Sequence, residues 1–197
     1  MGLPVSALLL AAGSSTRMGQ TKQLLPLGHK PVIRHCIDAL IEAGIGETAV
    51  VISSCGHGLA EHLRGLPVVV AVNENPGSDM AESVRSGLRR LQSFSSAILV
   101  CLCDHPLVTP ETIRTLVREH GRFPGDIIIP EFQGKRGHPS LFPRHLLDEI
   151  FSAKTLRDIV REYPSRVRLV PVRDEGVVLD MDEPRDYTAI LKRYLSK

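Results

Sequence analysis

Short runs of consecutive apolar residues recur along the chain and alternate with amphipathic stretches. The first run, residues 5–12, has the length of a strand that is buried on both faces. Similar runs, several of them rich in β-branched residues, predict further strands at residues 48–53, 68–73, 97–103, 126–130, 138–142, 167–172 and 177–180.

Between these runs, apolar residues return at helical spacing. Pro31 suits the first position of a helix and Gly44 its C-terminal stop, Asp79 or Ser78 suits an N-cap, and Thr109 suits another. The stretch at 131–137 is polar and predicts a loop. Helices are expected at residues 31–44, 59–63, 79–91, 110–120, 144–151, 156–163 and 183–195.

This alternation of apolar strands and helices predicts an α/β fold, with a mostly parallel sheet covered by helices on both faces. We expect one Rossmann-like, three-layer domain over residues 1–197. Ligands of such sheets bind beyond the carboxyl ends of the strands. Residues 13–22, Asp104 and residues 180–182 all follow predicted strands, so we expect them at one edge of the sheet.

Composition narrows the possible functions. The 197 residues are 43% hydrophobic, which supports a sizeable core, and the net charge of +2 with no Trp argues against nucleic-acid and polybasic membrane binding. The apolar N-terminal run has no cationic flank and ends at Gly13, so it predicts neither a signal peptide nor a membrane span. The four cysteines form no CxxC pair, which is typical of free thiols in a reducing cytoplasm.

The residues after the first strand have the chemistry of a phosphate site. Arg17 and Lys22 are cationic, and Arg17 has a planar fork that binds two phosphate oxygens at once. The plainer alternative is a surface turn with solvated cations, since neither a Walker A loop nor GxGxxG is present. Small residues that expose backbone N–H groups precede the two cations: Gly13, Ser14, Ser15 and Thr16.

Carboxylates follow two later strands. Asp104 ends the apolar run at 97–103, where it would either bind a metal ion or cap the next helix. Asp180 and Asp182 are two residues apart, so on a strand end they would point the same way, while the alternative is that one of them caps the final helix. Hard oxygen ligands of this kind suit Mg²⁺.

Three segments resemble the MobA-like nucleotidyltransferase family. LAAGSSTRMGQTK at 10–22 is similar to LAAGxSxRMGxxK, CDHPLVT at 103–109 to CDxPLxT, and DMDEPRDY at 180–187 to DxDTPEDY. The resemblance implies a nucleotidyltransferase fold like that of nucleotide-diphospho-sugar transferases, and Mg²⁺, with Mn²⁺ as an alternative, on Asp104, Asp180 and Asp182. It implies catalytic roles for Arg17, Lys22 and Asp104. The nucleotide-binding residues that it implies are Leu10, Ala11, Ala12, Gly13, Ser14, Ser15, Thr16, Arg17, Lys22, Asp79 and Ser83.

A fourth segment, RGHP at 136–139, resembles the branch of this family that handles molybdopterin, and it implies an acceptor site at Arg136, Gly137 and His138. That branch joins CMP from CTP to the phosphate of molybdopterin, releases pyrophosphate in the cytoplasm and supplies a recipient molybdoenzyme. Ala12 stands where the GTP-using branch has glycine, and its extra methyl favours the smaller base, cytosine.

Three alternatives remain at this point. The first two are enzymes: a GTP-using homologue, and a cytidylyltransferase that acts on a sugar or polyol phosphate. The third is a carrier without turnover that binds nucleotide and cofactor for a molybdoenzyme.

Overall fold

The sheet is built around the apolar strands that the sequence predicts. In the computed structural model, which describes residues 4–13, 18–56, 58–75, 77–92 and 94–196, all six residues of β1 (Val5–Leu10) are buried. β1 lies between β4 (Glu47–Ser53) and β6 (Ala97–Leu102), parallel to both, and β5 (Val69–Asn73) lies beyond β4. The other strands of this path are β7 (Ile127–Phe132), β9 (Ser140–Pro143) and β10 (Val167–Pro171). The strand order is β10-β7-β9-β6-β1-β4-β5, so the mostly parallel sheet is confirmed.

The other half of the sheet contains a hairpin that the sequence analysis did not expect. β7 (Ile127–Phe132) turns back into β8 (Lys135–Arg136), and β9 (Ser140–Pro143) then runs antiparallel between β6 and β7. The loop predicted at 131–137 is therefore wrong. The two turn residues, Gln133 and Gly134, have φ of 50° and 78°, which is the backbone of a tight hairpin turn.

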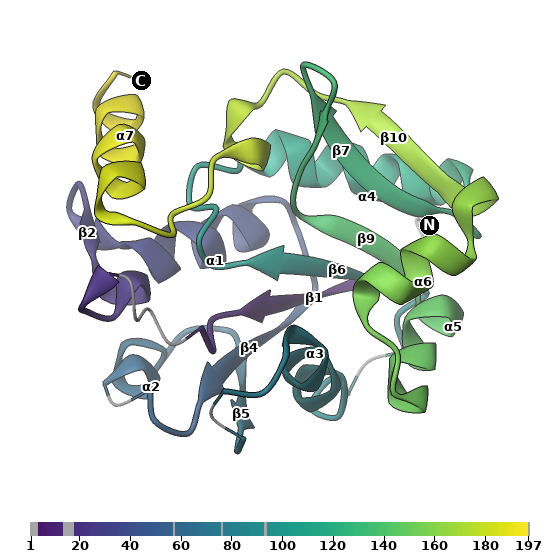
Figure 1. Ribbon diagram of the computed structural model, residues 1–197, viewed down its shortest axis with the longest axis horizontal. Coiled ribbons are helices and arrows are strands. Elements are labelled where there is room, and N and C mark those ends of the chain that lie inside the picture. The colour runs from purple at the N-terminus through teal and green to yellow at the C-terminus, as the bar shows by residue number, and fades with distance from the viewer. Residues whose placement is uncertain (1–3, 14–17, 57, 76, 93, 197) are drawn as a thin grey trace.

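Helices cover both faces, which confirms the three-layer α/β fold (Figure 1). Side chains alternate along β1, so Ala7 and Leu9 pack with α1 and α4 on one face, while Leu8 and Leu10 pack with α3, α5 and α6 on the other. The helices are α1 (Val32–Glu42), α2 (Leu59–His62), α3 (Met80–Leu88), α4 (Pro110–Arg122), α5 (Arg144–Leu147), α6 (Leu156–Glu162) and α7 (Pro184–Leu195). Short 3-10 turns and a small hairpin complete the described elements: η2 (Lys22–Leu24), β2 (Pro26–Leu27), β3 (Lys30–Pro31), η3 (Asp148–Ser152) and η4 (Pro164–Arg166).

The predicted helix starts are confirmed where the capping chemistry was readable. The Thr109 hydroxyl accepts from Thr112 N at the start of α4, and Asp79 Oδ1 accepts from Glu82 N at 2.9 Å at the start of α3. Pro31 is the N-cap of α1 rather than its first residue. No helix in the described ranges combines the length and apolarity that crossing a bilayer requires.

The segment after the edge strand β10 (Val167–Pro171) corrects the strand predicted at 177–180. It forms a 3-10 turn, η5 (Glu175–Val178), whose Gly176 N–H donates to Asp174 Oδ1 at 3.0 Å. A Cβ on Gly176 would lie 2.5 Å from the Leu107 carbonyl, so only glycine permits this approach. The segment therefore packs against the loop after β6 and does not join the sheet.

We expect Gly87→Ala to destabilise the protein. A Cβ at Gly87 in α3 would lie 2.8 Å from both Leu8 Cδ2 and Val51 Cγ2, in the packed layer between helix and sheet. Overpacking of this kind costs about 1–3 kcal/mol, measurable as a lower free energy of unfolding in urea. Gly121→Ala in α4 is the matched control, because nothing lies within 4 Å of its Cβ, and it should be neutral or stabilising by up to about 1 kcal/mol. A Gly87→Ala protein as stable as wild type would contradict this account of the packing.

Candidate active site

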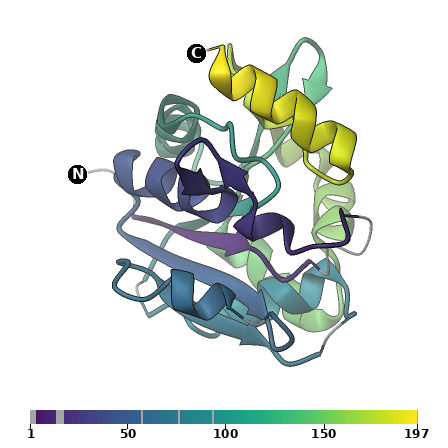
Figure 2. The same ribbon diagram turned by 90° about the vertical axis from the view of Figure 1, so that its left-hand side faces the viewer.

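A cavity of about 220 Å³ lies along the carboxyl ends of the four neighbouring parallel strands β6, β1, β4 and β5. We call it the strand-end cavity. Figure 2 looks onto this edge of the sheet. The cavity brings together many of the residues that the sequence analysis singled out: Leu10, Ala12, Gly13, Lys22, Asp79, Ser83 and Asp104. Ser14, Ser15, Thr16 and Arg17 lie outside the described residues, so their expected roles stay predictions.

Lys22 is the link between two of the expected carboxylates. Its Nζ donates to Asp104 Oδ2 at 2.8 Å and to Asp182 Oδ1 at 3.0 Å, although Asp104 and Asp182 come from distant parts of the chain. Burial by itself would lower the pKa of Lys22, but attraction to Asp104 and the hydrogen bonds to both carboxylates outweigh it and raise the pKa. Lys22 is therefore a cation at neutral pH.

Asp104 keeps one oxygen without a hydrogen-bond partner among the described residues. Its Oδ1 is buried, and the closest ionisable nitrogen recorded near it is His105 Nε2 at 3.9 Å, beyond hydrogen-bond length. A buried, unsatisfied carboxylate oxygen is costly unless a ligand completes it. No group of three or more His, Cys, Asp or Glu side chains in the described part of the chain forms a metal cluster. Any cation here would therefore rely on two carboxylates, with water and substrate oxygens as its other ligands.

The structure separates Asp180 from Asp182. With no strand at 177–180, the two side chains do not share a strand face: Asp180 is exposed, while Asp182 is half-buried against Lys22. Neither aspartate caps the final helix, because Glu183 does so in a capping box with Asp186. Asp186 Oδ2 accepts from the backbone N–H groups of Asp182 and Glu183, which fixes the position of Asp182.

Gln23 is a site residue that the sequence analysis missed. It is 2% exposed, and its Nε2 donates to the carbonyls of Ala11 and Gly13, at 2.9 Å and 3.1 Å. It therefore fixes the backbone at the start of the predicted phosphate loop. The available signal was one polar residue at the head of the otherwise apolar segment 23–27.

Gly137 and His138 pack against the backbone of η5. The His138 N–H donates to the Val177 carbonyl at 2.8 Å, and a Cβ on Gly137 would lie within contact of that same carbonyl. Gly137 was expected to admit a ligand, but the backbone of Val177 takes up that space. The His138 ring lies 5.3 Å, between centroids, from that of His105, which the sequence analysis left as structural.

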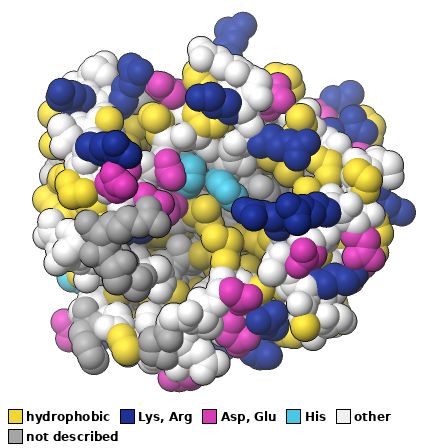
Figure 3. Space-filling view, viewed as in Figure 1, with side chains coloured by type: hydrophobic (Ala, Val, Ile, Leu, Met, Phe, Trp, Pro, Cys, Tyr) yellow, Lys and Arg dark blue, Asp and Glu magenta, His cyan; other side chains and the backbone are white. Residues whose placement is uncertain are grey.

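A second cavity of about 700 Å³ contains the expected acceptor residues Arg136, Gly137 and His138. Arg157 and Arg161 of α6, which the sequence analysis missed, also line it. We call it the arginine cavity. It shares Asp79 and Met80 with the strand-end cavity, so the two are neighbours. The space-filling view shows histidines near the centre of this hollowed face, with acidic side chains on one side and basic ones on the other (Figure 3). The signal for the α6 arginines was their spacing of four residues, which puts both on one helix face.

Comparison with known proteins identifies related chains. The sequence profile of the MobA-like NTP transferase domain matches residues 7–167. The crystal structure of Rv0371c from Mycobacterium tuberculosis is 27% identical with a TM-score of 0.82, covers 98% of this chain and 99% of that chain, and has also been solved in complex with manganese. A nucleotidyl transferase from Methanothermobacter (Mth528) has a TM-score of 0.86 at 23% identity over 99% of both chains, a similarity of fold. The bifunctional protein GlmU of Rhodospirillum rubrum is 35% identical over 57% of this chain, which spans only 25% of that relative.

We expect His138 to make stability fall at acidic pH. Burial, with a smaller effect of His105, lowers the pKa of His138 from 6.5 to about 4 in the folded protein. As pH falls, His138 of the unfolded chain takes up a proton before His138 of the folded protein does. The contribution of neutral His138 to the free energy of unfolding is therefore complete above pH 6.5 and is lost as pH falls towards 4.

The wild-type free energy of unfolding should therefore drop by about 2–3 kcal/mol more than that of His138→Gln between pH 7 and pH 4.5. Urea unfolding in EDTA measures this difference. His29→Gln, at an exposed position, should retain the wild-type slope. Equal slopes for wild type and His138→Gln would show that His138 is not buried as a neutral ring.

Proposed function

The chain belongs to the MobA-like NTP transferase family and is a nucleotidyltransferase, and we propose that it transfers CMP from CTP to the phosphate of a molybdopterin-type cofactor. Pyrophosphate is the second product. The observation that carries this proposal is the cluster of Lys22, Asp104 and Asp182 at the end of β6, beside a cavity that spans four strand ends. We propose residues 1–197 as one catalytic unit.

Charge is the main obstacle to this reaction, because both the triphosphate and the acceptor phosphate are anionic. A phosphate nucleophile is already ionised at neutral pH, so the protein needs to position the partners and neutralise charge rather than remove a proton. Lys22 supplies a fixed positive charge beside Asp104, and Arg17 of the predicted phosphate loop is the proposed second cation.

The two carboxylates fit a divalent cation. Asp104 offers a buried oxygen that no described residue satisfies, and Asp182 presents its carboxylate to the same ammonium group. We propose that Asp104 and Asp182 hold Mg²⁺ or Mn²⁺, which when bound neutralises charge on the phosphates. The manganese complex of the relative Rv0371c supports a divalent ion. Asp180 remains the weaker candidate, because it is exposed.

The arginine cavity supports an anionic acceptor. Arg136, Arg157 and Arg161 line it, and guanidinium groups bind phosphate oxygens in pairs. His138 stays neutral at physiological pH because its pKa is about 4, so it is suited to hydrogen bonding with a polar ring. The cavity adjoins the strand-end cavity at Asp79 and Met80, where an acceptor phosphate would meet the nucleotide.

The choice of CTP and of molybdopterin rests on Ala12 and on the RGHP segment. The competing candidates are GTP as donor, a sugar or polyol phosphate as acceptor, and a carrier without turnover. The buried free thiols Cys36, Cys101 and Cys103 support a reducing, cytoplasmic location. A molybdoenzyme that receives the product is the proposed partner.

We expect pyrophosphate release from CTP that depends on Mg²⁺, molybdopterin-type cofactor and Asp104. Asp104→Asn keeps the shape of the side chain but removes the charge, and it should lower kcat by about 100-fold or more. Asp148→Asn is the matched control, because its carboxylate pairs with Arg144 away from both cavities, and it should retain activity.

Assays with GTP, ATP and UTP and with sugar phosphates identify the donor and acceptor. Release with GTP alone would retain the reaction and overturn the assignment to CTP. Binding of CTP without turnover on any acceptor would favour the carrier.

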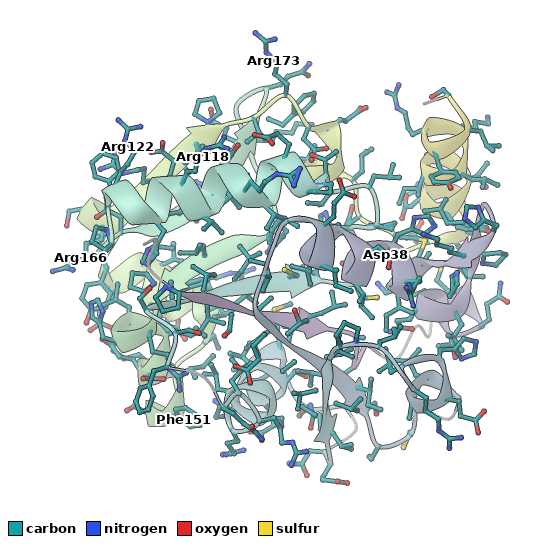
Figure 4. All side chains as sticks on the ribbon, turned by 180° about the vertical axis from the view of Figure 1, so that it is seen from behind. Asp38, Arg118, Arg122, Phe151, Arg166 and Arg173 are labelled. Atoms are coloured by element: carbon teal, nitrogen blue, oxygen red, sulfur yellow. The ribbon has the colours of Figure 1, made fainter. Side chains whose placement is uncertain are left out.

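We expect the α6 arginines to act on the acceptor and not on the nucleotide. Arg157→Ala and Arg161→Ala should each raise the KM for the acceptor about 10-fold, through the loss of one charged hydrogen-bonding group, and leave the KM for CTP unchanged. Arg118→Ala is the control, since Arg118 lies on the opposite face of the molecule, on α4, and pairs with Glu111 (Figure 4). An equal rise in the KM for CTP would contradict the assignment of α6 to the acceptor site.

A further inference from the structure

We infer that the Asn73 side chain sets the direction of the hydrogen bonds at one end of the strand-end cavity, and that this selects a base with two adjacent acceptors on its Watson–Crick edge, which is cytosine. The inference deepens the proposed function and rests on it, because a nucleotide must occupy the cavity. Asn73 ends the edge strand β5 and is 4% exposed.

The Asn73 side chain makes three hydrogen bonds to described residues. Its Nδ2 donates to Ser78 Oγ and to Ser83 Oγ, each at 3.0 Å, and its Oδ1 accepts from the backbone N–H of Asn75, also at 3.0 Å. Asn73, Asn75, Ser78 and Ser83 all line the strand-end cavity. One side chain thus connects the end of β5, the loop that follows it and the first turns of α3.

The chemistry of these bonds fixes which way the amide points. The Asn75 N–H is only a donor, so the Asn73 atom that faces it must be the carbonyl oxygen. The amino group must then face the two serines. Oxygen and nitrogen are too similar in shape to reveal which way an amide points. Here the hydrogen-bond partners determine the orientation.

The fixed amide in turn directs the serine hydroxyls. Nδ2 has only hydrogens to offer, so both serine oxygens act as acceptors towards it and their own hydrogens point elsewhere. Within the described ranges, neither the Ser78 nor the Ser83 hydroxyl donates to another protein group. Ser83 is 6% exposed, so its hydrogen is available chiefly to a molecule inside the cavity. The cavity wall here presents donors.

This wall lies where a base would lie. Asp104 and Lys22 stand at the end of β6, and Asn73 at the end of β5, three strands away in the order β6-β1-β4-β5. Three spacings amount to about 14 Å, which is comparable to the length of an extended nucleoside triphosphate. The phosphates would take the end at Lys22 and Asp104, and the base would take the end lined by Asn73, Ser78 and Ser83, where the carboxylate of Asp79 also lies.

Two donors that face the Watson–Crick edge of the base match cytosine and not uracil or guanine. Cytosine presents O2 and N3 as adjacent acceptors, uracil replaces the N3 acceptor with an N–H, and guanine presents the N–H groups of N1 and N2. A buried site that pairs fully with one base leaves polar groups unpaired against another, and such mismatches discriminate strongly. Hydrogen-bond direction thus adds to the size restriction from Ala12.

The test is Asn73→Asp. Aspartate still accepts from the Asn75 N–H, but its second oxygen accepts from the serines instead of donating, so the hydroxyls turn and present lone pairs to the cavity. We expect the ratio of kcat/KM for CTP to that for UTP to fall at least 10-fold, with the same change in the ratio of calorimetric binding constants. Because calorimetry measures the binding of CTP and UTP without an acceptor, this second ratio does not depend on which acceptor the enzyme uses.

Two further variants control the experiment. Ser54→Asp adds the same charge next to Asn73, because the Ser54 N–H donates to the Asn73 backbone carbonyl at 3.0 Å, but Ser54 is exposed and does not line the strand-end cavity, so this variant should keep the CTP-to-UTP ratio of wild type. Ser83→Ala removes one donor with little change in volume, and it should lower the ratio in the same direction, even if Asn73→Asp fails to fold.

The outcomes separate the inference from the proposed function. A wild-type protein that selects CTP, with unchanged ratios in both Asn73→Asp and Ser83→Ala, would overturn the inference and leave the proposed function intact. An equal fall in Ser54→Asp would attribute the effect to charge and also overturn the inference. A wild-type protein that turns over GTP in preference to CTP would overturn the inference and the assignment to CTP together.

Discussion

The ammonium group of Lys22 between Asp104 and Asp182 is the interaction on which the site depends. Two ionised carboxylates in one partly buried site repel each other strongly unless a positive charge lies between them. Lys22 satisfies this condition at 2.8 Å and 3.0 Å and thereby joins the loop after β6 to the segment before α7. The same need for positive charge underlies the proposal that the two carboxylates bind a divalent ion.

Hydrogen bonds of the Asp174 side chain and of the η5 backbone hold the neighbouring loops in place. The buried carboxylate of Asp174 accepts from the Thr109 N–H, from the hydroxyls of Thr109 and Thr112, and from Gly176 N. The Gly176 carbonyl contacts His105 Nδ1 at 3.3 Å, and the Val177 carbonyl accepts from His138 N. Through η5, the loop that carries Asp104 and the loop that carries His138 are therefore tied to a single segment.

The two cavities divide the chemistry between charge and hydrogen bonding. Charged groups gather at the end of β6 and along α6, whereas the end of β5 offers neutral donors arranged by Asn73. A nucleotide and an anionic acceptor need this kind of division, because phosphates are recognised by charge and bases by the direction of hydrogen bonds. The parallel sheet provides it, since neighbouring strands deliver their terminal residues to one edge at regular spacing.

The sequence by itself determined the layers, the parallel core and the residues at most strand ends. Apolar runs such as that of β1 are buried whatever their neighbours are, and Thr109 and Asp79 cap helices through contacts a few residues away, so both were readable locally. Ser14 to Arg17 were predicted from sequence alone, and their roles stay predictions.

Only the tertiary structure decided how distant segments meet. The η5 turn replaced a predicted strand because Gly176 packs on Leu107, nearly seventy residues away, and Asp182 rather than Asp180 reached Lys22 for the same reason. Gln23 and Asn73 make their hydrogen bonds to segments that only the fold brings near them. The spacing of Arg157 and Arg161 places them on one helix face, but only the fold shows which cavity that face lines. The physical cause is common to all of them: local pattern fixes which residues are buried and which helices begin, but the pairing of polar groups across the sheet edge depends on the packing of the whole chain.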